Sequence, residues 1–137
     1  MTVKLHHINL STDDVPRAGR FYREVMRLEA AREDVPRPEK TKGYAGDVEF
    51  VSDGAVQVHL SQRDAGAGFR AGQIVNPVTR GHIAFRTDDL KGFIARLERL
   101  GIPYSDWGNR AVAGWHQIFF HDPDGNVVEV HQKEAGA

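Results

Sequence analysis

Two stretches of this sequence resemble each other, and that repeat limits how the chain can fold more than any other feature. Residues 7–15 read His-Ile-Asn-Leu-Ser-Thr-Asp-Asp-Val, and residues 82–90 read His-Ile-Ala-Phe-Arg-Thr-Asp-Asp-Leu. Five of the nine positions are identical, and three of the others pair Asn with Ala, Leu with Phe and Val with Leu. Because internal self-similarity is typical of a duplicated structural unit, we expect two copies of one module.

Each copy has the same expected order of elements. Apolar residues alternate with other residues at the start of each copy, which indicates a strand. The following Thr-Asp-Asp supplies side-chain oxygens that can cap a helix, and helical spacing of apolar residues follows in 15–26 and 90–100. Residues 48–60 and 117–131 then read as hairpins with Asp-Gly in their turns. The order is therefore strand, helix and about three strands, written twice.

The length of 137 residues suits one domain. We place module 1 at about residues 1–63, a linker rich in Gly and Ala at about 64–80, and module 2 at about 81–132. The linker is either a plain connection or a flap. Residues 29–42 are charged and contain proline, and we interpret them as a solvated loop rather than a substrate lid.

Composition excludes several classes of function. A net charge of −1 gives no reason to expect nucleic acid or an anionic membrane as partner. The absence of cysteine rules out disulfides and thiolate ligands, so any metal must be held by nitrogen and oxygen. The sequence shows no secretory signal and no apolar run of membrane-spanning length, and we expect a cytoplasmic protein.

The predicted strands have one polar and one apolar face, because alternate side chains of a strand share a face. A wall of imidazoles and a carboxylate is suited to a first-row divalent metal. The polar face carries His7, His59, His82 and Glu129, together with Asn9, Gln57, Arg86, Gln117 and Phe119. The opposite face, which we expect to pack on the helices, carries Ile8, Leu10, Val58, Leu60, Ile83, Phe85, Val128 and Val130.

These residues resemble motifs of the vicinal oxygen chelate superfamily, which includes glyoxalase I, bleomycin-resistance proteins, fosfomycin-resistance thiol transferases and extradiol dioxygenases. The similar stretches are residues 5–8, 81–85 and 119–130, and the last contains the Asp-Pro-Asp-Gly-Asn turn that precedes the family's glutamate ligand. The resemblance implies an α+β fold. In it, two βαβββ modules form a cupped mixed β-sheet around a metal, with helices on the outer face.

By position, the resemblance implies that His7, His82 and Glu129 are metal ligands. The fourth ligand position falls on His59, where glyoxalase I enzymes usually have Glu, so His59 is either a fourth ligand or a base beside the metal. His6 competes for the first position, but strand parity places it among the apolar residues, and we expect His7. The implied cofactor is a divalent ion, with Zn, Ni, Mn, Fe and Co all compatible with such ligands.

Other polar residues have two interpretations each. Arg86 is either an anchor for a carboxylate or phosphate of the substrate or part of a surface salt bridge. Asn9, Gln57 and Gln117 contact either the substrate or a neighbouring strand, and Phe119 shares their wall. The remaining histidines, which we interpret as cavity or surface residues, are His116, His121 and His131.

The resemblance implies a metal-dependent enzyme of the glyoxalase-like branch, a lyase or isomerase acting on a small vicinal-oxygen metabolite. The metal would stabilise an enolate- or alkoxide-like intermediate, with Glu129 or His59 as catalytic proton carrier. Ser11 stands where glyoxalase I usually has an Arg that helps bind glutathione, which argues against lactoylglutathione lyase activity. The alternatives are a single-domain extradiol-type iron dioxygenase and a non-catalytic small-molecule binding protein. We expect a homodimer.

Overall fold

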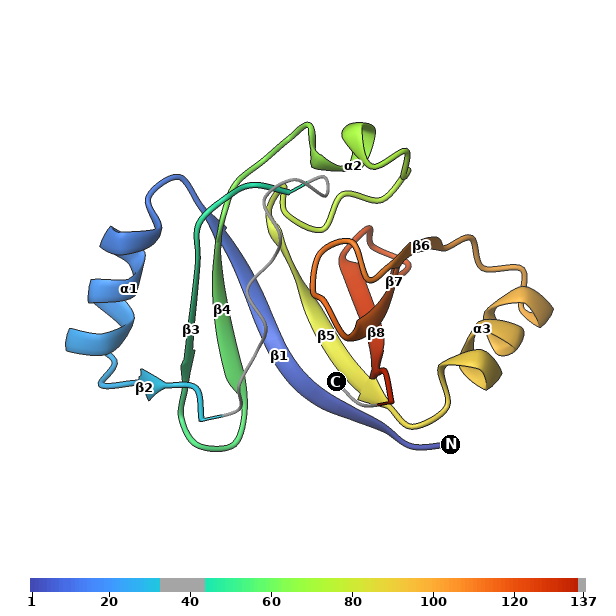
Figure 1. The fold of residues 1–137 in the computed structure, drawn as a ribbon, viewed down its shortest axis with the longest axis horizontal. Coiled ribbons are helices and arrows are strands. Elements are labelled where there is room, and N and C mark those ends of the chain that lie inside the picture. The colour runs from blue at the N-terminus through green and yellow to red at the C-terminus, as the bar shows by residue number, and fades with distance from the viewer. Residues whose placement is uncertain (33–43, 136–137) are drawn as a thin grey trace.

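The structure is a computed structural model that describes residues 1–32 and 44–135 (Figure 1). Most of the loop predicted at 29–42 lies outside these residues. The order of elements is the predicted one, with a short helix in the linker. The elements are β1 (Val3–Thr12), α1 (Val15–Glu24), β2 (Glu29–Ala30), β3 (Val48–Ser52), β4 (Gln57–Gln62), α2 (Ala67–Arg70), β5 (Gly81–Thr87), α3 (Leu90–Arg99), β6 (Ser105–Gly108), β7 (Trp115–His121) and β8 (Val127–Lys133).

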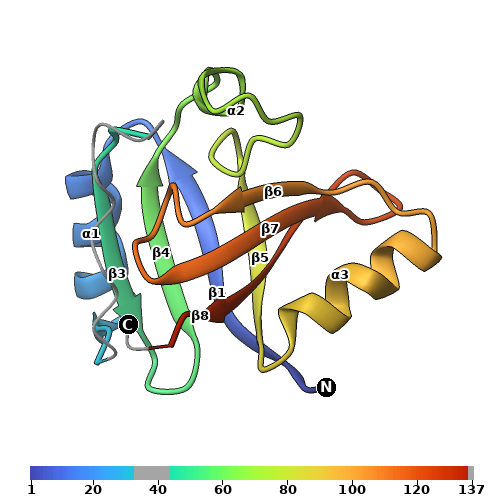
Figure 2. The ribbon, with the colours of Figure 1, turned by 45° about the vertical axis from the view of Figure 1, so that its right-hand side comes forward.

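The strands form one mixed eight-stranded sheet in the order β2-β3-β4-β1-β5-β8-β7-β6. The two modules meet at its centre, where β1 pairs antiparallel with β5, while β4 and β8 run parallel to β1 and β5. In Figure 2 the strands β7 and β8 turn across β4 and β1, and Trp115 of β7 packs near Phe50 of β3. The α+β fold and the cupped sheet predicted from the sequence are confirmed.

The two long helices begin where the Thr-Asp-Asp sequences predict. The carboxylate of Asp14 accepts a hydrogen bond from the backbone N–H of Arg17 at 3.1 Å, and that of Asp89 accepts from Gly92 at 2.9 Å. Each bond satisfies a backbone donor that has no partner inside its helix. None of the helices in the described ranges is long and apolar enough to cross a membrane.

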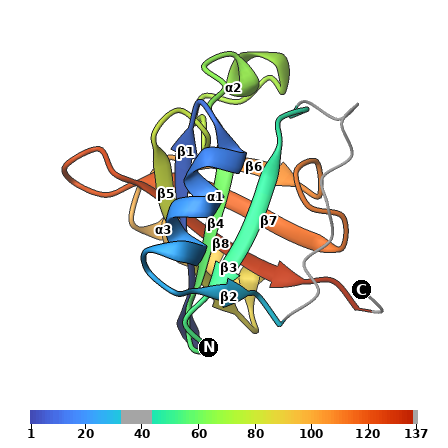
Figure 3. The ribbon, with the colours of Figure 1, turned by 90° about the vertical axis from the view of Figure 1, so that its left-hand side faces the viewer.

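The helices cover the outer face of the sheet only in part (Figure 3). Helix α1 contacts β3 and β4, and α3 contacts β8, so Leu60 and Val130 are buried as predicted. Ile8 and Ile83 form a cross-strand pair at the centre of the sheet and are 39 % and 36 % exposed. The prediction that this whole face packs on helices is wrong for them, because each helix covers only the outer part of its own module.

The linker closes one end of the cup. Ala67, Val75 and Val78 are buried in one apolar cluster with Trp107 and Phe119 from the second module. At the start of β5, the backbone of Gly81 lies very close to the backbone of β1. Gly81 has a φ of +134°, and a Cβ added there would lie 2.1 Å from the Asn9 carbonyl oxygen. Only glycine permits this approach, which aligns the two central strands.

Candidate metal centre

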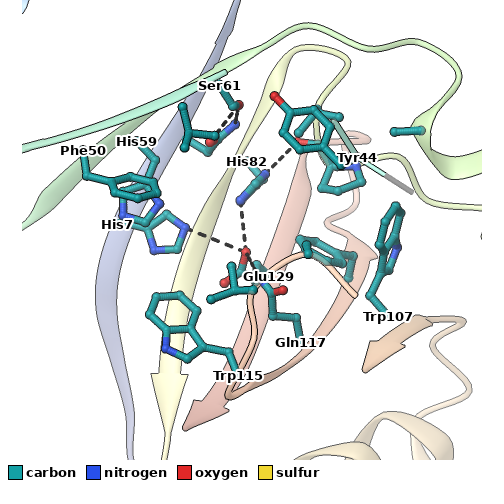
Figure 4. A pocket seen from close by; sticks show the side chains of 18 residues that line it. His7, Tyr44, Phe50, His59, Ser61, His82, Trp107, Trp115, Gln117 and Glu129 are labelled. Carbon is teal, nitrogen blue, oxygen red and sulfur yellow. Dashed lines mark hydrogen bonds and ion pairs between the residues drawn. The ribbon is translucent and has the colours of Figure 1, made fainter. Parts of the chain in front are cut away.

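The four predicted ligands come from the four central strands and gather inside the cup (Figure 4). His7 lies on β1, His59 on β4, His82 on β5 and Glu129 on β8. The side chains are almost entirely buried. The pairing of β1 with β5 within one chain brings equivalent strands of the two modules together, so a single chain supplies all four side chains.

Two imidazoles face one carboxylate oxygen. His82 Nε2 lies 3.1 Å from Glu129 Oε1, and His7 Nε2 lies 3.8 Å from the same atom. His82 Nδ1 is 2.7 Å from the Pro77 carbonyl oxygen, which only accepts, so Nδ1 carries a hydrogen. His82 Nε2 therefore faces the carboxylate with a lone pair unless a second proton or a metal ion lies between them.

Glu129 is 1 % exposed and is held by neighbours on both oxygens. His131 Nδ1 lies 2.6 Å from Oε2, and Gln117 Nε2 donates to Oε1 at 3.2 Å. Burial by itself raises the pKa of Glu129, but His7, His131 and His82 together hold it well below its ordinary value. Burial also lowers the pKa of His7 well below 6.5. At neutral pH the site therefore offers an ionised carboxylate and a neutral His7 imidazole, the forms that bind metals.

His131 holds Glu129 Oε2, the carboxylate oxygen that does not face His7 and His82. One nitrogen of its ring lies within 4.8 Å of ligand atoms of His7 and Glu129, so the three form a group that could hold a metal ion. However, Arg86 Nε donates to His131 Nε2 at 3.0 Å, and a guanidinium cannot accept. His131 Nδ1 therefore carries the hydrogen given to Glu129, and both ring nitrogens are engaged. The Arg86 Cζ atom lies 4.9 Å from the centroid of the Trp115 ring. Trp115 lines the cavity and Arg86 does not.

His6 also faces the histidine cluster, and the prediction from strand parity that it lies among the apolar residues is wrong. The pairing of β1 with β5 shifts register between Leu5 and His7, which leaves His6 at a bulge. Its Nδ1 lies 2.7 Å from His7 Nδ1, and its ring centroid is 4.9 Å from that of His131. The only sequence signal for this arrangement is the adjacent pair of histidines.

His59 lies beside His7 without facing Glu129. The two rings stack with centroids 3.8 Å apart and an interplanar angle of 13°. His59 Nε2 is 2.7 Å from Gln57 Oε1, so the predicted polar residue Gln57 contacts this histidine. Burial lowers the pKa of His59 to about 3, and the ring is therefore neutral at physiological pH.

The histidine–glutamate cluster lies at the polar end of a cavity of about 70 Å³. Asn9 and Ser61 are hydrogen-bonded to each other on its wall, at 2.8 and 3.0 Å. Of the other predicted residues, Gln117 and Phe119 line the cavity. Sequence reasoning missed most of the apolar wall, because its residues come from loops and from strands without a repeated motif. These are Tyr44, Val48, Phe50, Ala67, Pro77, Val78, Trp107, Ala111, Val112 and Trp115.

One carboxylate lines the cavity in the described part of the chain, and it is that of Glu129. Glu49, on β3, points to the other side of the sheet, where Arg23 of α1 forms an ion pair with it. Acid–base chemistry inside the cup therefore depends, among the described residues, on Glu129 and the imidazoles.

A family model described as the glyoxalase/bleomycin resistance protein/dioxygenase superfamily matches residues 4–130. Among solved structures, the chain is similar to a hypothetical protein from Bacillus halodurans, with 18 % identity, a TM-score of 0.71 and coverage of 100 % of this chain and 99 % of that one. It is also similar to a variant of Streptomyces coelicolor methylmalonyl-CoA epimerase in complex with 2-nitronate-propionyl-CoA, with 22 % identity, a TM-score of 0.67 and coverage of 96 % and 98 %. Methylmalonyl-CoA epimerase from Mycobacterium tuberculosis gives 19 % identity, a TM-score of 0.68 and coverage of 95 % and 87 %. At these identities the likeness shows the fold. No curated protein matches the chain significantly.

Proposed function

Because the chain belongs to the glyoxalase/bleomycin resistance protein/dioxygenase superfamily, we propose that it is a metal-dependent enzyme of the glyoxalase-like branch. The proposed reaction is of lyase or isomerase type, and the proposed substrate is a small compound with two vicinal oxygens. The superfamily includes epimerases, glyoxalases and dioxygenases, and its members commonly use a divalent metal.

The observation that carries this proposal is the way His7, His82 and Glu129 are held. His7 Nε2 and His82 Nε2 each face Glu129 Oε1, and each of the three side chains has its other polar atom bonded outward, to His6, Pro77 and His131 respectively. Outward bonds of this kind orient metal-binding side chains in proteins. The 3.1 Å contact between His82 Nε2 and the ionised carboxylate is satisfied by a proton or by a metal ion between them. The donor set therefore fits a divalent metal bound by nitrogen and oxygen.

A metal held there would supply Lewis-acid stabilisation of the negative charge that develops on an enolate or alkoxide oxygen. The chain supplies the rest. The aromatic and aliphatic wall surrounds the polar groups with apolar side chains, and Gln117 holds Glu129 Oε1 in place. We assign proton transfer to Glu129 and His59, the ionisable groups beside the reacting oxygens. Both are weak bases in the metal-free protein, because the pKa of His59 is lowered to about 3 and that of Glu129 is held well below its ordinary value.

One observation favours a second function, an extradiol-type dioxygenase. The contact between His59 and Gln57 leaves two histidines, His7 and His82, that face the carboxylate of Glu129. This is the composition of the facial triad of non-heme iron oxygenases. Anaerobic loading with Fe²⁺ followed by measurement of oxygen uptake with catechol-type substrates tests this alternative.

Metal analysis of the purified protein tests the proposed function. We expect about one equivalent of a divalent metal per chain, and loss of that metal in His82→Ala and in Glu129→Ala. His116→Ala is the matched control, because His116 is exposed and contacts Asp106 at 2.8 Å, outside the cavity. Failure of Zn, Ni, Mn, Fe and Co all to bind, or full metal retention in His82→Ala, would contradict the proposal.

A further inference from the structure

The linker between the two modules folds as a closed loop over residues 64–78. Its ends meet, because the backbone N–H of Asp64 donates to the Val78 carbonyl oxygen at 3.1 Å. The Asn76 amide also donates to the Asp64 carbonyl oxygen at 2.9 Å, and Arg70 forms an ion pair with the Asp64 carboxylate inside the loop. Compact loops with adjoining ends and internal side-chain contacts often have a functional role.

The loop is fixed to the second module through Val75, which is buried. The backbone N–H of Val75 donates to Ser105 Oγ at 3.1 Å, and its carbonyl oxygen accepts from Trp107 Nε1 at 3.3 Å. Both partners lie on β6. Residues 76–78 therefore continue from a fixed point toward the start of β5.

One peptide group of the loop connects Asn76 to His82. The Val78 N–H and the Pro77 C=O belong to the same planar, trans peptide group, so the two bonds point in opposite directions. Asn76 Oδ1 accepts from the Val78 N–H at 3.0 Å. At the other end, the Pro77 carbonyl oxygen lies 2.7 Å from His82 Nδ1. A hydrogen bond at the first end of this peptide group therefore directs its carbonyl toward the His82 ring.

The Asn76 side chain controls the rotation that would turn this carbonyl away. A proline ring fixes its own φ at about −65°, so the direction of the following peptide group depends mainly on ψ of Pro77. A bond from an asparagine oxygen to the N–H two residues later closes a turn, and here that bond holds this ψ. Asn76 Nδ2 donates to a carbonyl oxygen, which establishes that Oδ1 is the amide atom facing Val78.

Two acceptors compete for hydrogens of the His82 ring. The Pro77 carbonyl oxygen faces Nδ1, and Glu129 Oε1 lies 3.1 Å from Nε2, a contact drawn in Figure 4. A neutral imidazole carries one hydrogen, and without an acceptor at Nδ1 the ionised Glu129 would hold that hydrogen at Nε2. A metal ligand needs the opposite arrangement, with a hydrogen on Nδ1 and the lone pair of Nε2 directed at the metal.

We propose that Asn76 is a positioning residue for His82, because its side chain holds the Pro77 carbonyl oxygen against His82 Nδ1 and so keeps a hydrogen on that nitrogen. Asn76 does not line the cavity, and it acts through the Pro77 peptide group alone. The placement of the hydrogen follows from the protein contacts. Its consequence for metal binding rests on the proposed function.

¹⁵N NMR of the metal-free protein tests the placement, because imidazole nitrogens with and without a hydrogen have distinct shifts. The His82 signals are assigned by their absence from His82→Ala. At mildly alkaline pH we expect Nδ1 to carry a hydrogen in the unsubstituted protein and to lack it in Asn76→Ala. Asn76→Asp keeps an oxygen for the Val78 N–H and should keep the Nδ1 hydrogen. Asn76→Leu, close in volume to the native residue, is measured beside Asn76→Ala in case the latter does not fold.

The matched control is Asn126→Ala, which also removes an asparagine amide from a turn. Asn126 Nδ2 donates to Asp122 Oδ2 at 2.8 Å, and we expect the His82 signals of this variant to equal those of the unsubstituted protein. Competition between the protein and a chromophoric chelator for Zn²⁺ measures the consequence. We expect about tenfold weaker binding by Asn76→Ala, and binding within about threefold of the unsubstituted protein by Asn76→Asp and Asn126→Ala.

Three results would overturn the inference. They are an Nδ1 without hydrogen in the unsubstituted protein, an Nδ1 hydrogen that persists in Asn76→Ala or Asn76→Leu, and equal loss of that hydrogen in Asn76→Asp. Unchanged Zn²⁺ affinity in a variant that has lost the Nδ1 hydrogen would overturn the consequence for metal binding. Failure of the unsubstituted protein to bind any of the five metals would overturn the proposed function and leave the hydrogen placement standing.

Discussion

Arg86 Nε donates a hydrogen bond to His131 Nε2 at 3.0 Å, and His131 Nδ1 in turn donates to Glu129 Oε2 at 2.6 Å. A guanidinium is protonated at every physiological pH, so it fixes which nitrogen of His131 carries the hydrogen. The tautomer in turn fixes the Glu129 carboxylate, with Oε2 bound and Oε1 directed at His82 and His7. Arg86 is therefore a positioning residue for the proposed metal ligand, two side chains away from it.

Arg86→Met keeps much of the aliphatic stem and removes the donor. We expect it to lower metal affinity by about tenfold, within the range found when groups that orient metal ligands are removed. Competition with a chromophoric chelator measures the affinity. Arg99→Met, at an exposed position on α3, is the matched control and should bind metal as the unsubstituted protein does. Equal affinities for the two variants would contradict the positioning role of Arg86.

The contact between His6 and His7 leads to a second prediction. A metal bound at His7 Nε2 requires the hydrogen on His7 Nδ1, and His6 Nδ1 is the acceptor 2.7 Å away. We expect His6→Ala to weaken metal binding by about tenfold. His6→Asn supplies an amide oxygen in place of the ring nitrogen and should retain affinity within about threefold. The same loss in both variants would show that the ring itself, rather than an acceptor, is needed.

The repeat and the alternation of strand faces predicted much of this site and failed at identifiable places. His7 and His82 occupy equivalent positions of the repeat on the paired strands β1 and β5, and Glu129 lies on β8 next to β5. His6 was misplaced because a bulge adds one residue and reverses parity, and no local residue type indicates it. The linker residues Ala67 and Val78 were missed because their place in the wall depends on long-range packing rather than on periodicity.

The buried histidines predict a loss of stability in acid for the metal-free protein. In the unfolded chain His59 binds a proton near its ordinary pKa of 6.5, whereas in the folded chain burial lowers that pKa to about 3. Between these values the unfolded state holds more protons, so the free energy of unfolding falls as pH falls from 6.5 toward 3. One such group changes the folding constant by up to about tenfold per pH unit. Denaturant titrations should show this decline, and a less steep one in His59→Asn. Equal slopes for the two proteins would show that protonation of His59 is not responsible for the decline.

The exposed apolar centre of the sheet supports the prediction of a homodimer. Leu5, Ile8 and Ile83 lie on β1 and β5 between the areas covered by α1 and α3, and they are at least 36 % exposed. Adjacent exposed apolar residues are typical of association surfaces. We expect a dimer in analytical ultracentrifugation at micromolar concentration and a monomer for Ile83→Lys, with metal content unchanged. A monomeric unsubstituted protein would exclude this assembly.

The last prediction concerns His59, which sits where the repeat places the counterpart of Glu129. A fourth ligand would leave the metal with four protein donors and favour chemistry without a change of oxidation state. The structure instead holds His59 Nε2 against Gln57 Oε1 at 2.7 Å and stacks the ring on His7. We therefore expect His59→Ala to retain metal within about threefold of the unsubstituted protein, while His82→Ala loses on the order of a hundredfold or more. Turnover by His59→Ala should fall while metal content stays constant, as expected for a group that handles a proton or positions the substrate.

A second variant, Gln57→Leu, separates metal coordination by His59 from a role beside the metal, because it frees His59 Nε2 without removing the ring. If His59 is able to coordinate, metal affinity should rise in Gln57→Leu and fall in His59→Ala as far as in His82→Ala. That pair of results would establish four ligands and withdraw the support that the triad gives to dioxygenase activity.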